Sequence, residues 1–266
     1  MDILQAPLRP ADRRFRFFRS VMALVLREMS STYGRSPGGY LWLVLEPVAA
    51  LTLLSFVFSI VLRSPSLGSN FMLFYATGYL PFAIYMSVSS KLAASIRYSR
   101  QLLEYPAVTF ADALIARLVL DILTHLLVFS LVVMGIIQIF DLNPILNWSA
   151  IFTSLAMIVG IAISIGVMNC FLMTGFPLWE RVWAILTRPL FIISGILFIP
   201  EDVPAQYRDW MMMNPLAHGV SEMRNGFYGT YDAVHVDPIY VFSLALGVGV
   251  FGLLFLLKNH KDIALK

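Results

Sequence analysis

Long apolar stretches separated by short polar segments dominate this chain. Each stretch approaches the roughly 20 residues that a helix needs to cross a hydrocarbon core about 30 Å thick. The six stretches are Tyr40–Leu62, Phe71–Ser89, Ala113–Phe140, Trp148–Met173, Val182–Ile199 and Ile239–Leu257. The pattern predicts an all-α membrane protein with six transmembrane helices, whose function is transport, a channel or chemistry within the membrane.

The composition supports a membrane protein. Hydrophobic residues make up 59% of the chain and charged residues 13%, against about 45–50% and about 25% in soluble domains. The net charge of +3 comes from basic residues beside the apolar stretches, where such residues orient membrane proteins. We therefore expect no nucleic-acid partner.

Positive charge alternates along the polar segments. Seven arginines precede the first stretch, Asp141–Asn147 has no basic residue, and Pro200–Pro238 has two arginines against six acidic residues. Because Lys and Arg accumulate on the cytoplasmic side, both termini are predicted to be cytoplasmic. The predicted organisation is a cytoplasmic or interfacial leader over residues 1–38, a six-span domain over 39–257 and a cytoplasmic tail over 258–266.

The leader has the pattern of an amphipathic helix. Apolar residues recur on one helical face at a spacing of three to four residues: Phe15, Phe18, Met22, Val25 and Met29. Such a helix lies in the membrane interface with its basic residues on lipid headgroups. The predicted lipid contacts are Arg13, Arg16 and Arg27.

Two further segments between the stretches have structure-forming patterns. Lys91–Tyr105 reads as an amphipathic cytoplasmic helix, either a docking element for a partner or a linker along the membrane. Pro200–Pro238 is too apolar for a free loop and too interrupted for a span. Short re-entrant or interfacial helices fit it, since irregular backbone is tolerated at membrane depth when protein buries it.

Motifs for catalysis or metal binding are missing from the sequence. It has no G-x-x-x-x-G-K-[ST] phosphate loop and no H-E-x-x-H or paired-cysteine metal site. We therefore expect no catalytic residues, no metal and no cofactor in this chain.

Charged residues in the third stretch form one potential site. Arg117, Asp121 and His125 lie at positions i, i+4 and i+8, on one helical face. Charges inside a membrane are costly, so they usually pair or face protein or water. A structural ion pair between Arg117 and Asp121 is favoured over a place in a substrate path.

The second stretch contains an aromatic stripe: Phe71, Phe74, Tyr75, Tyr79, Phe82 and Tyr85. Aromatic rings at these positions suit both sugar binding and interfacial packing. Small residues repeat every fourth position in the fourth and sixth stretches, which lets helices approach closely. Whether that contact lies within one chain or between two is open. These small residues are Ala156, Gly160, Ser164, Ala245 and Gly249.

Several motifs resemble a known family. The segment from Arg35 to Trp42, followed by Glu46-Pro47, is similar to the first-span entry of type-two ABC exporter permeases, and most of all to KpsM-like capsular polysaccharide permeases. Weaker motifs of the same family follow in order: Leu80-Pro81-Phe82, Ile115-Ala116-Arg117 and Asn214-Pro215-Leu216. Pro37 departs from the family pattern.

The resemblance implies a homodimer of six-span subunits in the bacterial inner membrane. Each subunit would pair with a cytoplasmic ATPase, which binds ATP and Mg²⁺, and the dimer would export a lipid-linked polysaccharide. Periplasmic and outer-membrane export components are further candidate partners.

The same resemblance assigns residues to these roles. The ATPase-coupling residues would be Lys91, Arg97, Tyr98, Arg100, Glu104, Trp179, Glu180 and Arg181. The channel at the dimer interface would be lined by Tyr40, Trp42, Phe71, Tyr75, Tyr79, Phe82 and Tyr85.

Other functions remain open at this point. Exporters of O-antigen, teichoic acid or drugs share the architecture. An ion-coupled transporter would use Asp121 and His125 as its titratable groups. A membrane-embedded transferase would draw its catalytic residues from one segment: Asp202, Asp209, His218 and Glu222.

Overall fold

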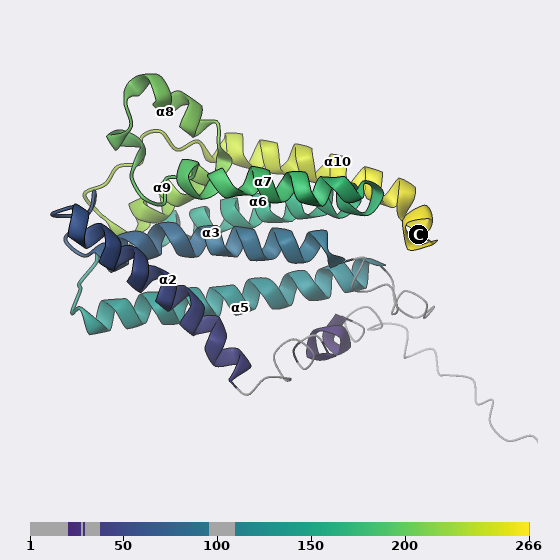
Figure 1. Cartoon of the computed structure of the whole chain (residues 1–266), viewed down its shortest axis with the longest axis horizontal. Helices are drawn as coiled ribbons and strands as arrows, with labels where there is room; N and C mark the ends of the chain where they lie inside the picture. The colour runs from purple at the N-terminus through teal and green to yellow at the C-terminus, as the bar shows by residue number, and fades with distance from the viewer. Residues whose placement is uncertain (1–20, 28, 30–37, 96–109, 266) are drawn as a thin grey trace, which may run out of the picture.

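The computed structural model of the chain describes residues 21–27, 29, 38–95 and 110–265. Across these ranges every regular element is a helix. In chain order they are α2 (Gly39–Val61), α3 (Phe71–Ala93), α5 (Phe110–Ile139), α6 (Trp148–Gly175), α7 (Pro177–Ile193), η2 (Pro200–Asp202), α8 (Ala205–Met212), α9 (Pro215–Phe227) and α10 (Pro238–Leu265). Figure 1 shows the long helices side by side, with α2 crossing them obliquely and α8 projecting at one end.

Five helices are long and apolar enough to cross a membrane: α2, α3, α5, α6 and α10. They coincide with the predicted first, second, third, fourth and sixth spans. The helix α10 continues to Leu265, past the start of the predicted tail at residue 258.

The predicted fifth span, Val182–Ile199, is wrong in its limits. The helix found there is α7, which has 17 residues, begins at Pro177 and ends at Ile193. Proline suits the first helical turn, and Gly195 ends the helix with a φ of +73°, a left-handed conformation that glycine adopts readily. The apolar run continues past this glycine, so hydrophobicity alone did not reveal the end of the helix.

Asparagine caps begin three of the helices. The side chain of Asn70 accepts a hydrogen bond from the Leu73 N–H at 3.0 Å, at the start of α3. Asn147 starts α6 and Asn214 starts α9 in the same way. These caps satisfy N–H groups that have no partner inside their own helix.

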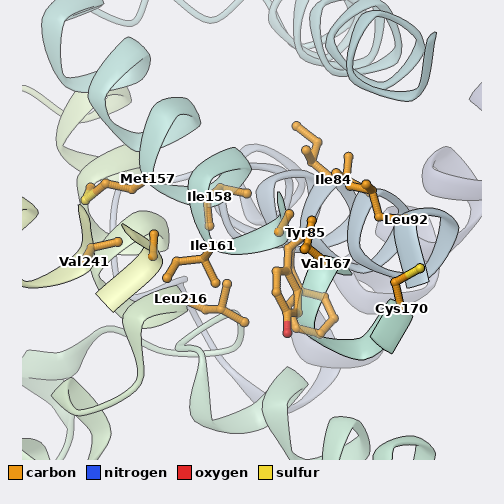
Figure 2. Packing of buried hydrophobic residues seen from close by; sticks show 14 of the residues in the cluster. Ile84, Tyr85, Leu92, Met157, Ile158, Ile161, Val167, Cys170, Leu216 and Val241 are labelled. Atoms are coloured by element: carbon orange, nitrogen blue, oxygen red, sulfur yellow. The ribbon is translucent and has the colours of Figure 1, made fainter. Parts of the chain in front are cut away.

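The helix α3 lies at the centre of the bundle and packs against α2, α5, α6 and α9. Figure 2 shows one part of this core, where Ile84 and Tyr85 of α3 meet Ile158 and Ile161 of α6 beside Leu216 of α9. Lipid tails are as apolar as these side chains, so close packing, rather than removal of apolar surface from water, stabilises the contacts.

Four of the five predicted small residues join α6 to α10 within one chain, whereas Ala156 is exposed. A Cβ atom added at Gly160 would lie 3.8 Å from the Cβ of Ala245, and one added at Gly249 would lie 3.4 Å from the Cβ of Ser164. The question left open by the sequence is therefore answered, because this surface is filled inside the subunit.

Residues 21–27 of the leader are helical. Val21 and Val25 pack against Ala116 of α5, whereas Arg27 is exposed. Arg13 and Arg16 lie outside the described residues, so the interfacial position of the leader stays a prediction.

The elements η2, α8 and α9 form what we call the helical cap, at the left end of the bundle in Figure 1. The hydroxyl of Ser66, between α2 and α3, donates to the Asp202 carboxylate at 2.6 Å. The N–H of Asn147, between α5 and α6, donates to the Gly226 carbonyl at 2.9 Å. The cap is therefore tied to the connections that enter α3 and α6.

The close approach of α10 to α6 gives a testable prediction. A Cβ atom at Gly252 would lie 2.9 Å from the backbone of Met168, whereas one at Gly247 would meet nothing within 4 Å. Gly252→Ala should therefore destabilise the folded protein by about 1–3 kcal/mol through overpacking. Gly247→Ala, its control in the same helix, should be neutral or gain up to about 1 kcal/mol of helix propensity. Thermal unfolding of the purified variants measures both, and equal melting temperatures would contradict the packing.

Candidate transport groove

A groove of about 590 Å³ lies between α2, α3 and α5. On α3 it extends from Tyr79 to Lys91, about 18 Å at 1.5 Å per residue. Its walls are mostly apolar and aromatic, with a few polar side chains, the composition typical of ligand sites. The lining residues are Leu43, Glu46, Pro47, Tyr79, Leu80, Phe82, Ala83, Ile84, Met86, Ser87, Ser90, Lys91, His125, Val128 and Phe129.

The helices α2 and α7 both contact α3 beside this groove. The ring of Phe82, which lines the groove, meets Phe191 of α7 edge to face, with ring centroids 5.7 Å apart. Only 6% of the apolar span of α2 is buried, against 67% of that of α3. The groove is therefore bordered on one side by α2, a helix with almost no buried residues.

A buried carboxylate organises the end of the groove away from the helical cap. Asp121 is 2% exposed, and its Oδ1 atom pairs with the Lys91 ammonium. The same oxygen accepts from the Ser87 hydroxyl at 3.2 Å and lies 3.3 Å from Nδ1 of His125. The sequence analysis missed Lys91 as the partner of Asp121, because it comes from a different helix.

The predicted channel aromatics separate into two sets. Tyr79 and Phe82 line the groove. Tyr75 is fully buried and its ring packs against Phe58, Phe71 and Phe74, with centroids 5.3, 6.4 and 5.3 Å away.

The remaining aromatic predictions lie elsewhere. Tyr85 is buried in the core of Figure 2, and Trp42 is 65% exposed on α2. The side chain of Tyr40 lies outside the described residues. Of the six predicted residues whose side chains the structure describes, only Tyr79 and Phe82 line the groove.

The predicted ATPase-coupling residues are only partly described. Arg97, Tyr98, Arg100 and Glu104 lie outside the described residues. Lys91 pairs with Asp121 and so links α3 to α5, although 41% of its side chain remains exposed.

The second predicted coupling group lies at the start of α7. The indole N–H of Trp179 donates to the Asn169 side chain of α6 at 2.9 Å, and the Trp179 ring stacks on Trp183. Glu180 and Arg181 beside it are exposed. This arrangement fixes the turn between α6 and α7 and leaves the two charged side chains accessible.

A buried arginine holds the connection between α7 and the helical cap. Arg224 of α9 has no exposed surface and donates to the carbonyls of Ile196 and Phe198, each at 2.8 Å. Its guanidinium also lies 4.2 Å from the centroid of the Phe74 ring on α3. Burial lowers the pKa of Arg224 to about 10, so the group stays charged at neutral pH. Sequence reasoning missed this residue because no spacing marks its partners.

A buried histidine joins the helical cap to the start of α10. Nε2 of His218 bonds the Met212 carbonyl at 2.7 Å, and Nδ1 accepts from the Asp237 N–H at 3.0 Å. Both bonds together require the neutral imidazole with its proton on Nε2. Burial lowers the pKa of His218, opposed by the bond to Met212 and by the charge of Asp237.

The residues considered for a transferase have separate partners. His218 makes the two backbone bonds just described, Asp202 accepts from Ser66, and Glu222 accepts from Asn225 at 3.4 Å. Across the described residues, no three His, Cys, Asp or Glu side chains lie together as a metal site would require. Nothing in this geometry favours a catalytic centre in the cap.

A bundle of membrane-length helices around a groove with aromatic and polar walls defines a polytopic membrane transport protein. The chain matches the model of the ABC-2 type transporter family over residues 19–228, well over half of its length. It belongs to that family.

Curated relatives carry more specific names. The chain is 29% identical over 227 residues to the polysialic acid transport protein KpsM of Escherichia coli, covering 85% of this chain and 88% of that protein. It is 24% identical over 245 residues to the capsule polysaccharide export inner-membrane protein CtrC of Neisseria meningitidis, covering 92% of each. It is 25% identical over 224 residues to BexB of Haemophilus influenzae, also a capsule polysaccharide export inner-membrane protein, covering 81% of this chain and 83% of that one.

The division of the aromatic residues gives a prediction. Tyr79→Ala removes a groove wall, so transport should fall while the amount of folded protein stays near that of the wild type. Tyr75→Ala opens a cavity in the core and should cost about 3–5 kcal/mol, as for other large aromatic truncations. Transport per folded molecule, with yield measured by size-exclusion chromatography, distinguishes the two. Unchanged transport in the Tyr79→Ala variant would show that Tyr79 does not contribute to the transport site.

The bonds of His218 predict a dependence of stability on pH. Because its folded pKa is below the ordinary value of about 6.5, the unfolded chain binds the proton more readily. This contribution to stability is present above pH ~6.5 and is lost as pH falls through the lowered pKa of the folded state. His218→Gln should flatten the loss of melting temperature between pH 7.5 and 5. The exposed His235→Gln is the control, and a parallel loss in all three proteins would contradict the assignment.

Proposed function

We propose that this chain is the membrane subunit of an ATP-driven exporter that moves a lipid-linked capsular polysaccharide across the bacterial inner membrane. Its membership of the ABC-2 transporter family carries the proposal, and the relatives named for capsule export support the choice of substrate. The chain is a transport subunit, and ATP hydrolysis, with its Mg²⁺, belongs to a separate cytoplasmic partner.

The proposed assembly is a homodimer of six-span subunits with cytoplasmic termini. The fifth span would be α7, whose 17 residues are at the short end of the range of about 17–25 residues for a spanning helix. A single residue, Phe176, separates α6 from α7, so the two helices form a tight hairpin. The helical cap would then lie on the external side, with α9 as a re-entrant helix that packs on α3 and α6.

The groove supplies one half of the proposed export path. Tyr79 and Phe82 offer aromatic faces to sugar rings, and Ser87 and Ser90 offer polar atoms to sugar hydroxyls. Weak contacts of this kind are tolerant of sequence along a glycan, which suits a chain that must slide. The leader helix would position the lipid end at the cytoplasmic leaflet, while periplasmic and outer-membrane components would receive the product.

The coupling segment is proposed to be Lys91–Glu104, seated on the ATPase. Lys91, the first residue of this segment, forms an ion pair with Asp121 of α5. Trp179, Glu180 and Arg181 would form a smaller second contact, supported by the exposure of the two charged side chains.

The structure favours no ion-coupled alternative. That function needs titratable groups that gain and lose ions along the path. Asp121 and His125 are instead engaged with each other and with Lys91, an arrangement that stabilises the bundle.

The proposal predicts a stable complex with an ATPase. The tagged wild-type chain, purified in mild detergent, should retain a soluble ATPase in stoichiometric amount. The double variant Arg100→Glu, Glu104→Lys should lose that ATPase and surface polysaccharide together, because it reverses charges at the proposed contact, while the membrane fold stays intact. Arg63→Glu, in the connection between α2 and α3, is the control and should retain both.

The same strains test the substrate. A strain without this chain should accumulate polysaccharide inside the cell, and the wild-type chain should restore its export. Accumulation of O-antigen instead of capsule would identify O-antigen as the substrate. A wild-type chain that co-purifies with no ATPase would refute the ATP-driven exporter itself.

A further inference from the structure

Two opposite charges lie inside the apolar helices beside the groove. Glu46 is the sole acidic or basic residue of α2, and Arg188 is the sole one of α7 beyond its first five residues. Each directly precedes a proline inside its helix, and both are exposed. Charges are rare at such positions because hydrocarbon does not solvate them, so each requires a partner.

Neither charge finds that partner among the residues that the structure describes. No hydrogen bond or ion pair joins Glu46 or Arg188 to any residue in the described ranges. The other charged side chains of the groove are balanced, because Lys91 and Asp121 pair with each other. Glu46 and Arg188 are therefore the charges of this surface that remain to be satisfied.

The two charges lie at similar depths in the bundle. Glu46 lines the groove beside Tyr79 and Phe82 of α3. Phe191, three residues after Arg188, packs against the same Phe82 ring. Three helical residues correspond to about 4.5 Å along the axis, so a pair between these long side chains needs little displacement along the membrane normal.

We propose that Glu46 of one copy forms an ion pair with Arg188 of a second copy of this chain. In a two-fold symmetric dimer the same surface meets itself, so each contact occurs twice. Two pairs then form, α2 of each copy packs against α7 of the other, and the face of α3 between them turns toward the two-fold axis. The inference rests on the proposed homodimer and goes beyond it, because it names the residues that fix the contact.

Charge complementarity selects a second copy as the occupant of this surface. A lipid tail satisfies neither charge, and a neutral sugar offers hydroxyl groups to both without explaining why their signs are opposite. The apolar side chains around the two charges are exposed on the same helices and supply the packing area: Leu41, Leu45, Leu53, Phe56, Ile185 and Ile192. An ion pair enclosed by them would be largely desolvated, with each charge compensated by the other.

Disulfide formation between two differently tagged copies tests the contact. In a Cys170→Ala background, Glu46→Cys is placed in one copy and Arg188→Cys in the other, and membranes are oxidised before electrophoresis. We expect a mixed dimer that disappears on reduction. The control pairs Arg188→Cys with Leu246→Cys, an exposed position on α10, and should give no mixed dimer.

Charge reversal provides a second measurement that does not depend on cysteine geometry. Glu46→Lys or Arg188→Glu alone should lower the dimer fraction on native gels by roughly tenfold or more, because a buried like-charge or unpaired contact remains. The double variant should restore it to near the wild-type level. Arg63→Glu, outside the candidate spans, should leave the dimer unchanged.

The outcomes separate this inference from the function on which it rests. A wild-type dimer that exports polysaccharide but gives no mixed disulfide, and whose double reversal fails to rescue, would overturn the Glu46–Arg188 contact alone. A wild-type chain that is monomeric while active would overturn the homodimer as well.

Discussion

Hydrocarbon offers no hydrogen bonds, and the positions of the polar residues in this bundle follow from that constraint. Asp121 takes its partners from two helices, and Arg224 takes two backbone carbonyls that no helix uses. Asn70, Asn147 and Asn214 accept hydrogen bonds from backbone N–H groups at the starts of α3, α6 and α9. In the groove, Glu46 has no ion-pair partner among the described residues, and this unpaired charge in an apolar helix marks the surface as functional.

The same constraint explains how α7 ends. After Ile193 the chain turns at Gly195 and leaves carbonyls at Ile196 and Phe198 without helical partners. Arg224 satisfies both at once, and its planar guanidinium stacks on an aromatic ring of α3. One side chain therefore joins the end of α7, the helical cap and the central helix. Two carbonyl acceptors and the face of an aromatic ring compensate the burial of this charge.

Hydropathy predicted the spans of α2, α3, α5, α6 and α10 because length and composition alone define them. It misplaced the fifth span because Gly195 ends α7 inside an apolar run, and the end depends on a backbone angle rather than on hydrophobicity. The aromatic stripe of α3 gave two groove residues, Tyr79 and Phe82. Its other members turn inward, since α3 has neighbours on most of its sides, and that burial becomes visible only when the helices are assembled.

The arrangement of partners also indicates which parts move together. The helix α3 ends at Ala93 and α5 begins at Phe110. Because Lys91 of α3 and Asp121 of α5 pair with each other, we expect these two helices to move as one unit. The helix α2 is barely buried against them and borders the groove on its other side. We therefore expect the groove to change its width between α2 and the α3–α5 pair, while the tightly packed contact of α6 with α10 stays fixed.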